Sequence, residues 1–204
     1  MSEGEKLGLR ERKKLETREA LGWATVRLVV ERGMDNVSVE DIAAEAGVSP
    51  RTFNNYFSSK AEAIAARHLA RVRQITVLFQ ARPATEPLWQ ALTAAVVEQA
   101  GIGHGPPDPK WLTGVKLMIA ERALQSAFVE AAIVSGRELA VAVAARTGTD
   151  VDRDLYPRLV AAAVGAANQV ATEQWLAADP PIPLAPLLRE ALDQFSAGLP
   201  DPSA

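Results

Sequence analysis

Residues 38–57 read SVEDIAAEAGVSPRTFNNYF and contain two short helical patterns separated by a glycine. Ser38 and Asp41 form an approximate capping box at the start of the first pattern. Gly47 can adopt the left-handed conformation that ends this helix, and Pro50 suits the first position of the next helix. Two short helices joined by such a tight turn are typical of a helix-turn-helix.

The second of these helices has the composition of a probe for the major groove of DNA. Phe53 and Phe57 lie one turn apart and are expected to anchor it inward. Its other side chains can bond base edges or phosphates; these are Arg51, Thr52, Asn54 and Asn55. A helix pair in any α-helical bundle could have the same turn and polar face, so the spacing alone leaves both interpretations open.

The chain from about residue 9 to residue 62 resembles the DNA-binding domain of the TetR (tetracycline-repressor) family. The motifs that carry the resemblance are Glu31-Arg32-Gly33, Ser38-Val39, Asp41-Ile42-Ala43, Ala46-Gly47-Val48-Ser49, Thr52-Phe53, Tyr56-Phe57 and Ser59-Lys60. It implies a transcriptional regulator, not an enzyme, that binds a palindromic operator in double-stranded DNA as a homodimer. Repression until a small-molecule effector releases the operator is the family's default.

The resemblance also assigns roles to single residues. It implies that Arg51, Thr52 and Asn55 read bases, and that Tyr56 and Lys60 contact phosphates. Many family members have an aromatic residue at position 54, so Asn54 is expected to bond a phosphate or a base instead. The predicted DNA-binding set also includes Ser38 and Ser49.

The charge distribution agrees with DNA binding at the front of the chain. Residues 1–73 contain 13 Lys and Arg against 11 Asp and Glu, a net +2, and residues 74–204 contain 9 against 14, a net −5. The positive charge is concentrated in Arg10, Arg12, Lys13 and Lys14. This basic arm either reaches the DNA or is a solvated run of charge.

Helical spacing recurs along the whole chain, so we predict an all-α fold of about nine helices. The expected helices begin at residue 9 and end near residue 197, as follows: 9–32, 38–46, 50–57, 59–79, 86–100, 110–122, 124–146, 153–178 and 187–197. We expect an N-terminal helix-turn-helix domain over residues 1–60. Residues 61–204 would form a helical domain for effector binding and dimerisation.

The middle helices are rich in large apolar side chains that could line an effector pocket. The predicted ligand-binding residues are Trp89, Leu92, Trp111, Val115, Met118, Leu124, Phe128 and Asn168. Because polar residues are sparse among them, an apolar or amphipathic effector is expected. The alternative is that these side chains belong to an ordinary hydrophobic core.

Apolar stripes on the last two predicted helices indicate a dimer surface. The predicted interface residues are Leu159, Ala162, Ala166, Val170, Leu188, Leu192 and Phe195. Small residues in the first stripe would permit close approach of a second helix. Both stripes could instead face the chain's own core.

Composition excludes several other classes of protein. The chain has no cysteine, only His68 and His104 as histidines, and no phosphate-binding glycine loop or metal-binding motif, so no cofactor or metal is expected. The charged N-terminus lacks a signal sequence, and no apolar run suits a membrane span, which favours a cytoplasmic protein. An enzyme is the main alternative from another class of protein, and a helical scaffold that binds protein partners but no DNA is the second alternative.

Overall fold

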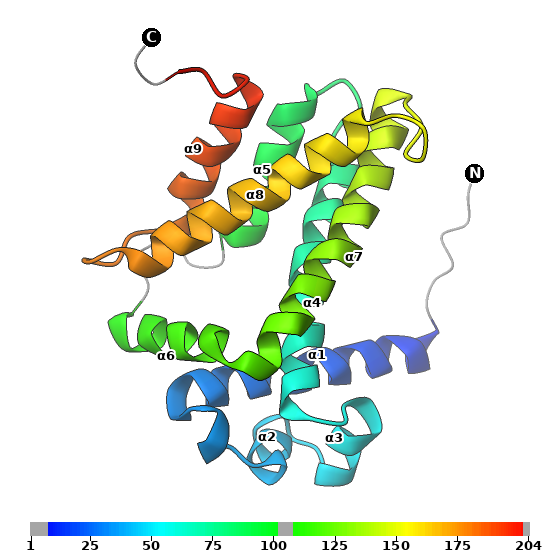
Figure 1. Ribbon diagram of the computed structural model, residues 1–204. Coiled ribbons are helices and arrows are strands. Elements are labelled where there is room, and N and C mark those ends of the chain that lie inside the picture. Colours follow the sequence, from blue (N-terminus) through cyan, green and yellow to red (C-terminus); the bar gives the residue numbers. More distant parts are fainter. Residues whose placement is uncertain (1–7, 102–107, 202–204) are drawn as a thin grey trace. The chain divides into compact units, whose positions relative to one another are not determined.

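The computed structural model describes residues 8–101 and 108–201, and within these ranges the regular elements are all helices (Figure 1). The helices are α1 (Leu9–Arg32), a 3₁₀ turn η1 (Met34–Asn36), α2 (Val39–Glu45), α3 (Pro50–Tyr56), α4 (Lys60–Ala81), α5 (Leu88–Ala100), α6 (Pro109–Ala120), α7 (Arg122–Thr147), α8 (Tyr156–Ala177) and α9 (Leu184–Ser196). The predicted all-α fold of about nine helices is confirmed. His104 lies outside the described residues.

The helix ends follow local sequence signals closely. Helix α1 has the predicted bounds, whereas α9 begins at Leu184, three residues earlier than expected. Pro186 therefore lies in the first turn of α9, where a missing N–H removes no intrahelical hydrogen bond. Helix α8 begins at Tyr156, with Pro157 in its first turn for the same reason.

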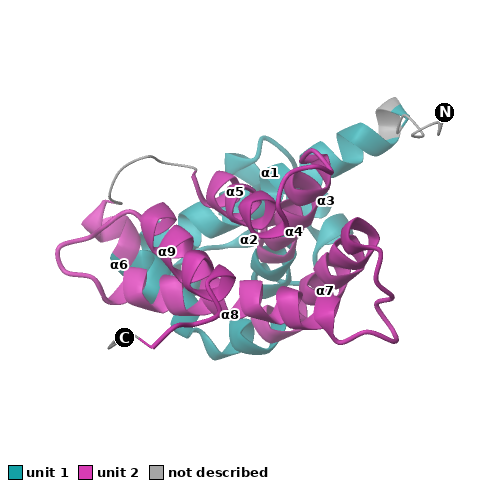
Figure 2. Ribbon diagram, turned by 90° about the horizontal axis from the view of Figure 1, so that it is seen from above, with its two compact units in different colours: residues 1–67, 113–127 teal, residues 68–112, 128–204 magenta. Residues whose placement is uncertain are grey.

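The chain forms two compact units, which Figure 2 shows in different colours. Unit 1 contains residues 1–67 and 113–127, and unit 2 contains residues 68–112 and 128–204. Their boundaries fall inside α4, α6 and α7. This division differs from the boundary expected at residue 60, because part of α6 and the start of α7 belong to the same unit as the helix-turn-helix.

Unit 1 has a small apolar core between α1, α2, α3 and the start of α4. Its fully buried side chains include Leu21, Ile42, Phe53 and Ile64. Gly114 of α6 lies against α1 so closely that a Cβ atom there would overlap the carbonyl oxygen of Val30. Glycine at position 114 therefore permits this backbone contact.

Unit 2 has a larger core built from the second half of α4 and from α5, α7, α8 and α9. Phe79, Leu92, Val143 and Leu192 are buried in it. Helix α9 packs against both α5 and α8 (Figure 1). Within the described ranges, no helix combines the length and the apolar character that crossing a membrane requires.

Candidate nucleic-acid interface and ligand cleft

The turn between α2 and α3 has the geometry that its sequence predicts. The Ser38 Oγ accepts a hydrogen bond from the Asp41 amide at 3.0 Å, and the Asp41 Oδ2 accepts one from the Ser38 amide at 2.9 Å. The hydrogen bond from the Ser38 side chain, followed by that from its amide, lowers the pKa of the Asp41 carboxyl. Gly47 has φ +67°, and the chain then enters α3 with Pro50 in its first turn.

Helix α3 is anchored by two aromatic side chains on its inner face. Phe53 and Phe57 are both buried, with ring centroids 5.7 Å apart, as their spacing predicts. The Arg18 guanidinium lies 4.7 Å from the Phe57 ring centroid, so α1 also holds this end of α3. This anchoring leaves Arg51, Asn54 and Asn55 exposed on the outer face.

The hydroxyl groups near the start of α3 form hydrogen bonds within the motif. The Ser49 Oγ accepts from the Thr52 amide at 3.2 Å and lies 2.9 Å from the Thr52 Oγ1. Thr52 and Tyr56 are half-buried, whereas Ser38 and Ser49 are exposed. Ser49 therefore caps the first turn of α3, as Ser38 caps that of α2, and both serines remain at the surface of the motif.

Lys60, the predicted phosphate contact, forms hydrogen bonds within the motif. Its Nζ donates to the carbonyl oxygen of Met34 and, at 2.6 Å, to that of Val37. The side chain is partly buried. Lys60 thus joins the start of α4 to the segment before α2, and only its third N–H is left for a phosphate.

The basic arm lies in the first turns of α1. Arg12, Lys13 and Lys14 are exposed, and Arg12 forms an exposed ion pair of 3.6 Å with Glu16. The side chain of Arg10 lies outside the described residues. The exposure of this arm agrees both with a contact to DNA and with a solvated run of charge.

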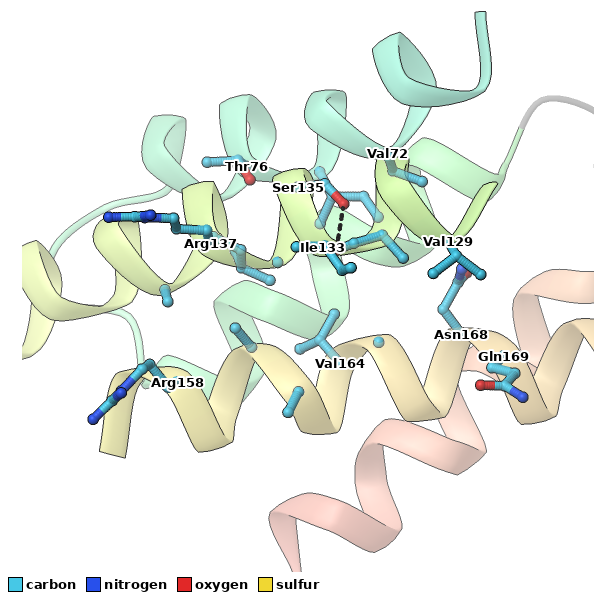
Figure 3. A pocket seen from close by; sticks show the side chains of 18 of the residues that line it. Val72, Thr76, Val129, Ile133, Ser135, Arg137, Arg158, Val164, Asn168 and Gln169 are labelled. Atoms are coloured by element: carbon cyan, nitrogen blue, oxygen red, sulfur yellow. Dashed lines mark hydrogen bonds between the residues drawn. The ribbon is translucent and has the colours of Figure 1, made fainter. Parts of the chain in front are cut away.

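Unit 2 contains a cleft of about 960 Å³ between α4, α7 and α8 (Figure 3). Its size lies within the range of about 300–1,000 Å³ typical of sites for small molecules. Most of its lining is apolar, with side chains such as Val72, Ile75, Ile133 and Val164. A few polar groups interrupt this lining, among them Thr76, Ser135, Asn168 and Gln169.

His68 of α4 lines the same cleft and contacts Phe128. Their ring centroids are 4.6 Å apart. Burial, and secondarily the positive charge of Arg71, lowers the pKa of His68 to about 4. The imidazole is therefore neutral at pH 7 and presents no charge to a ligand in the cleft.

The cleft contains only part of the predicted ligand-binding set. Phe128 and Asn168 line it, whereas Leu92 and Leu124 are fully buried in the cores of their units. The other four predicted residues, Trp89, Trp111, Val115 and Met118, are not among its lining residues. Sequence reasoning missed the residues from α4 and most of those from α7, because helical spacing predicts an apolar face but not an unfilled space beside it.

Two glycines in the middle of long helices could have indicated the unfilled space of the cleft. Gly136 of α7 and Gly165 of α8 both line the cleft. A Cβ atom at either position would meet no heavy atom within 4 Å. Neither glycine is required by packing, and both leave room beside the helix.

The predicted dimer residues divide between the two helices. On α8, Leu159 and Val170 are 63% and 57% exposed, and Ala162 and Ala166 are also exposed. On α9, Leu188 and Leu192 are 1% and 0% exposed, so their prediction as dimer contacts is wrong. They pack within their own chain, and Phe195 is half-buried against the same core.

Comparison with known proteins identifies relatives of both parts of the chain. A family profile described as bacterial regulatory proteins, tetR family, matches residues 24–66, and one described as the MftR C-terminal domain matches residues 86–200. The HTH-type transcriptional regulator TcmR of Streptomyces glaucescens is 30% identical over 173 residues, which are 82% of this chain and 76% of TcmR.

Two solved structures share the fold at low sequence identity. The fatty acid degradation regulator FadR from Bacillus halodurans is 18% identical, with a TM-score of 0.61 over 90% of this chain and 96% of FadR. SmeT, the repressor of the Stenotrophomonas maltophilia multidrug efflux pump SmeDEF, was solved in complex with triclosan. That complex is also 18% identical, with a TM-score of 0.61 over 92% of this chain and 98% of SmeT.

Proposed function

The chain belongs to the tetR family of DNA-binding bacterial regulators, and from this premise we propose that it is a repressor released from a palindromic operator by an apolar or amphipathic effector. The observation that carries the DNA-binding part is the outer face of α3. Arg51, Asn54 and Asn55 are exposed there, above a buried pair of phenylalanines. Arginine and asparagine are the side chains best suited to bidentate bonds with guanine and adenine.

The proposed repressor acts as a dimer, because one short helix reads too few bases for selectivity. We place the dimer surface on the exposed face of α8, which contains Leu159, Ala162, Ala166 and Val170. Two alanines among these four residues let a second helix approach closely. A two-fold dimer supplies the two copies of α3 that half-sites about one DNA turn apart require.

The cleft of unit 2 is the proposed effector site, since its size and apolar lining suit a small amphipathic molecule. Three residues separate α3 from α4, and α4 lines this cleft with His68, Val72 and Ile75. Helix α4 therefore has residues in both units. An effector releases the operator only if it binds the DNA-free state of the protein more tightly than the DNA-bound state.

The experiment that tests this proposal is selection of bound duplexes from a random pool, followed by fluorescence anisotropy on the selected sequence. Arg51→Ala should weaken binding by about 1 to 3 kcal/mol and relax the preference at one base pair in each half-site. The matched control is Arg122→Ala, which removes an exposed charge from α7 in unit 1. The control should bind like the parent.

Two results would contradict the proposal. If Arg51→Ala binds the selected duplex as the parent does, α3 is not the reading helix. If no palindrome is enriched, and binding lacks the steep salt dependence expected of phosphate contacts, the protein is not an operator-binding regulator.

A further inference from the structure

The residues that line the cleft of unit 2 differ in how deeply they are buried. The charged side chains among the described lining residues are all exposed; these are Arg137, Asp152 and Arg158. Six lining residues are buried and form what we call the floor of the cleft: Ile75, Thr76, Leu139, Ala140, Ala161 and Val164. Thr76 of α4 is the one member of this floor with a polar side chain.

The hydroxyl of Thr76 lacks the hydrogen bond that a buried threonine within a helix commonly makes. Thr25 donates to the carbonyl oxygen of Leu21 at 2.7 Å, and Thr147 to that of Val143 at 2.9 Å, in each case four residues back along the helix. No hydrogen bond joins the Thr76 side chain to any residue that the structure describes. Its hydroxyl therefore keeps a free donor and a free acceptor.

This hydroxyl is also open to the cleft. Thr76 lines the cleft and retains 9% exposure. In the described part of the chain, Nε of Arg67 is the one buried side-chain polar atom that has neither a partner nor accessible surface. The Thr76 oxygen is thus surrounded by apolar neighbours but can still be reached by a ligand. Because a buried hydroxyl without a hydrogen bond costs free energy, a ligand that supplies the missing partner gains affinity.

The other neutral polar side chains of the lining are placed differently. Ser135 donates to a carbonyl oxygen of its own helix at 3.3 Å (Figure 3). Gln169 is exposed and donates to a carboxylate of its own helix at 2.9 Å. His68 and Asn168 are only half-buried. Thr76 is therefore the polar group that a ligand meets where the lining is most deeply buried.

We propose that Thr76 forms a hydrogen bond with a hydroxyl or carbonyl group on the buried end of the effector, and that this end carries no charge. The inference rests on the proposed effector site and adds the chemical class of the ligand. A threonine hydroxyl both donates and accepts, so it can pair with either group. The rest of the floor is apolar and offers no counter-charge, and burial of an ion without one is costly. The apolar body of the ligand would lie against Ile75, Leu139 and Val164.

The test compares naphthalene, 2-naphthol and 2-naphthoate, which share one ring system and differ in having no polar group, a hydroxyl or a carboxylate. Isothermal titration calorimetry on the full chain at pH 7 measures the association constant of each probe. The parent should bind 2-naphthol more tightly than 2-naphthoate. Thr76→Val keeps the shape of the side chain but removes the hydroxyl, so the ratio of the 2-naphthol constant to the naphthalene constant should fall about three- to tenfold.

Thr93→Val is the matched control. Thr93 of α5 is 8% exposed, has no side-chain hydrogen bond within the described residues, and does not line the cleft. Both variants should fold, because neither substitution leaves a buried polar group without its partner. Thr93→Val should keep the parent ratio, and Thr76→Ser, which retains the hydroxyl, should keep most of it. If Thr76→Val also keeps the parent ratio, Thr76 does not contact the ligand and the inference is overturned.

The remaining outcomes separate this inference from the proposed function. If 2-naphthol and naphthalene release the selected duplex but their ratio does not depend on Thr76, the effector site stands and only the role of Thr76 is wrong. If 2-naphthoate binds more tightly than 2-naphthol, the effector class is charged, and the inference is overturned. If none of the probes binds, or binding does not release the duplex, the effector part of the proposed function falls together with this inference.

Discussion

His68 is neutral in the folded chain because burial beside Phe128 disfavours the imidazolium. In the unfolded chain its pKa returns to about 6.5, whereas in the folded chain it is about 4. Between these two values the unfolded state binds a proton that the folded state does not. The free energy of unfolding is therefore unaffected above the unfolded pKa and decreases as the pH falls toward the folded pKa.

His68→Gln should remove this dependence. From about pH 7.5 to about pH 5, the parent should lose about 2 kcal/mol of unfolding free energy more than the variant does. Urea denaturation at the two pH values, followed by circular dichroism, measures both losses. Equal losses in parent and variant would show that His68 takes up its proton in the folded state as readily as in the unfolded state.

For single residues, the sequence predicts the caps, turns and inward-facing side chains that depend on residues a few positions away. The Ser38 cap, the Gly47 turn and the inward placement of Phe53 follow from residues within a few positions of each other. The partners of Lys60 could not be found in this way. Its carbonyl acceptors lie 26 and 23 residues away along the chain, beyond any local pattern.

The packing of α6 on α1 depends on the absence of a side chain at Gly114. Gly114→Ala would place a methyl group on the Val30 carbonyl, and overlap with the backbone cannot be relieved by a change of rotamer. We expect it to lower the free energy of unfolding by about 1 to 3 kcal/mol. Urea denaturation of the full chain measures this loss.

Gly136→Ala is the control for the packing of α6, because Gly136 is also helical but a Cβ atom there meets nothing within 4 Å. It should be neutral or stabilise the protein by up to about 1 kcal/mol, since alanine is the better helix former. A lower free energy of unfolding for Gly114→Ala, but not for Gly136→Ala, would distinguish steric overlap from helix propensity. A shift in the same direction for both variants would contradict the contact between α6 and α1.

Helical periodicity predicts which face of an element is apolar, but not what covers that face. The stripe on α9 was expected to meet a second copy of the chain, yet Leu188 and Leu192 pack against α5 and α8 of the same chain. The large side chains in the middle helices were likewise expected to line the pocket, whereas Leu92 and Leu124 fill the cores. In both cases the partner surface comes from distant parts of the sequence.

For the whole molecule, function depends on two copies, because a palindrome is read only when two recognition helices have a fixed separation. The α8 face proposed for this contact remains exposed in a single chain, with Leu159 and Val170 more than half accessible. Single apolar side chains at a protein surface are common and cost little free energy. Their burial against a second copy is favourable and would stabilise the dimer. The same side chains contribute little to the folding of one chain, so dimerisation and folding can be separated by experiment.

Val170→Arg should therefore abolish the dimer without unfolding the chain. An arginine in the α8 contact would place a charged side chain in a surface that the dimer buries. Light scattering after size exclusion should give the mass of one chain, with unchanged circular dichroism and much weaker operator binding. Ala145→Arg adds the same charge at an exposed position of α7 and should stay dimeric. If Val170→Arg remains a dimer, two copies meet through a surface other than this face of α8.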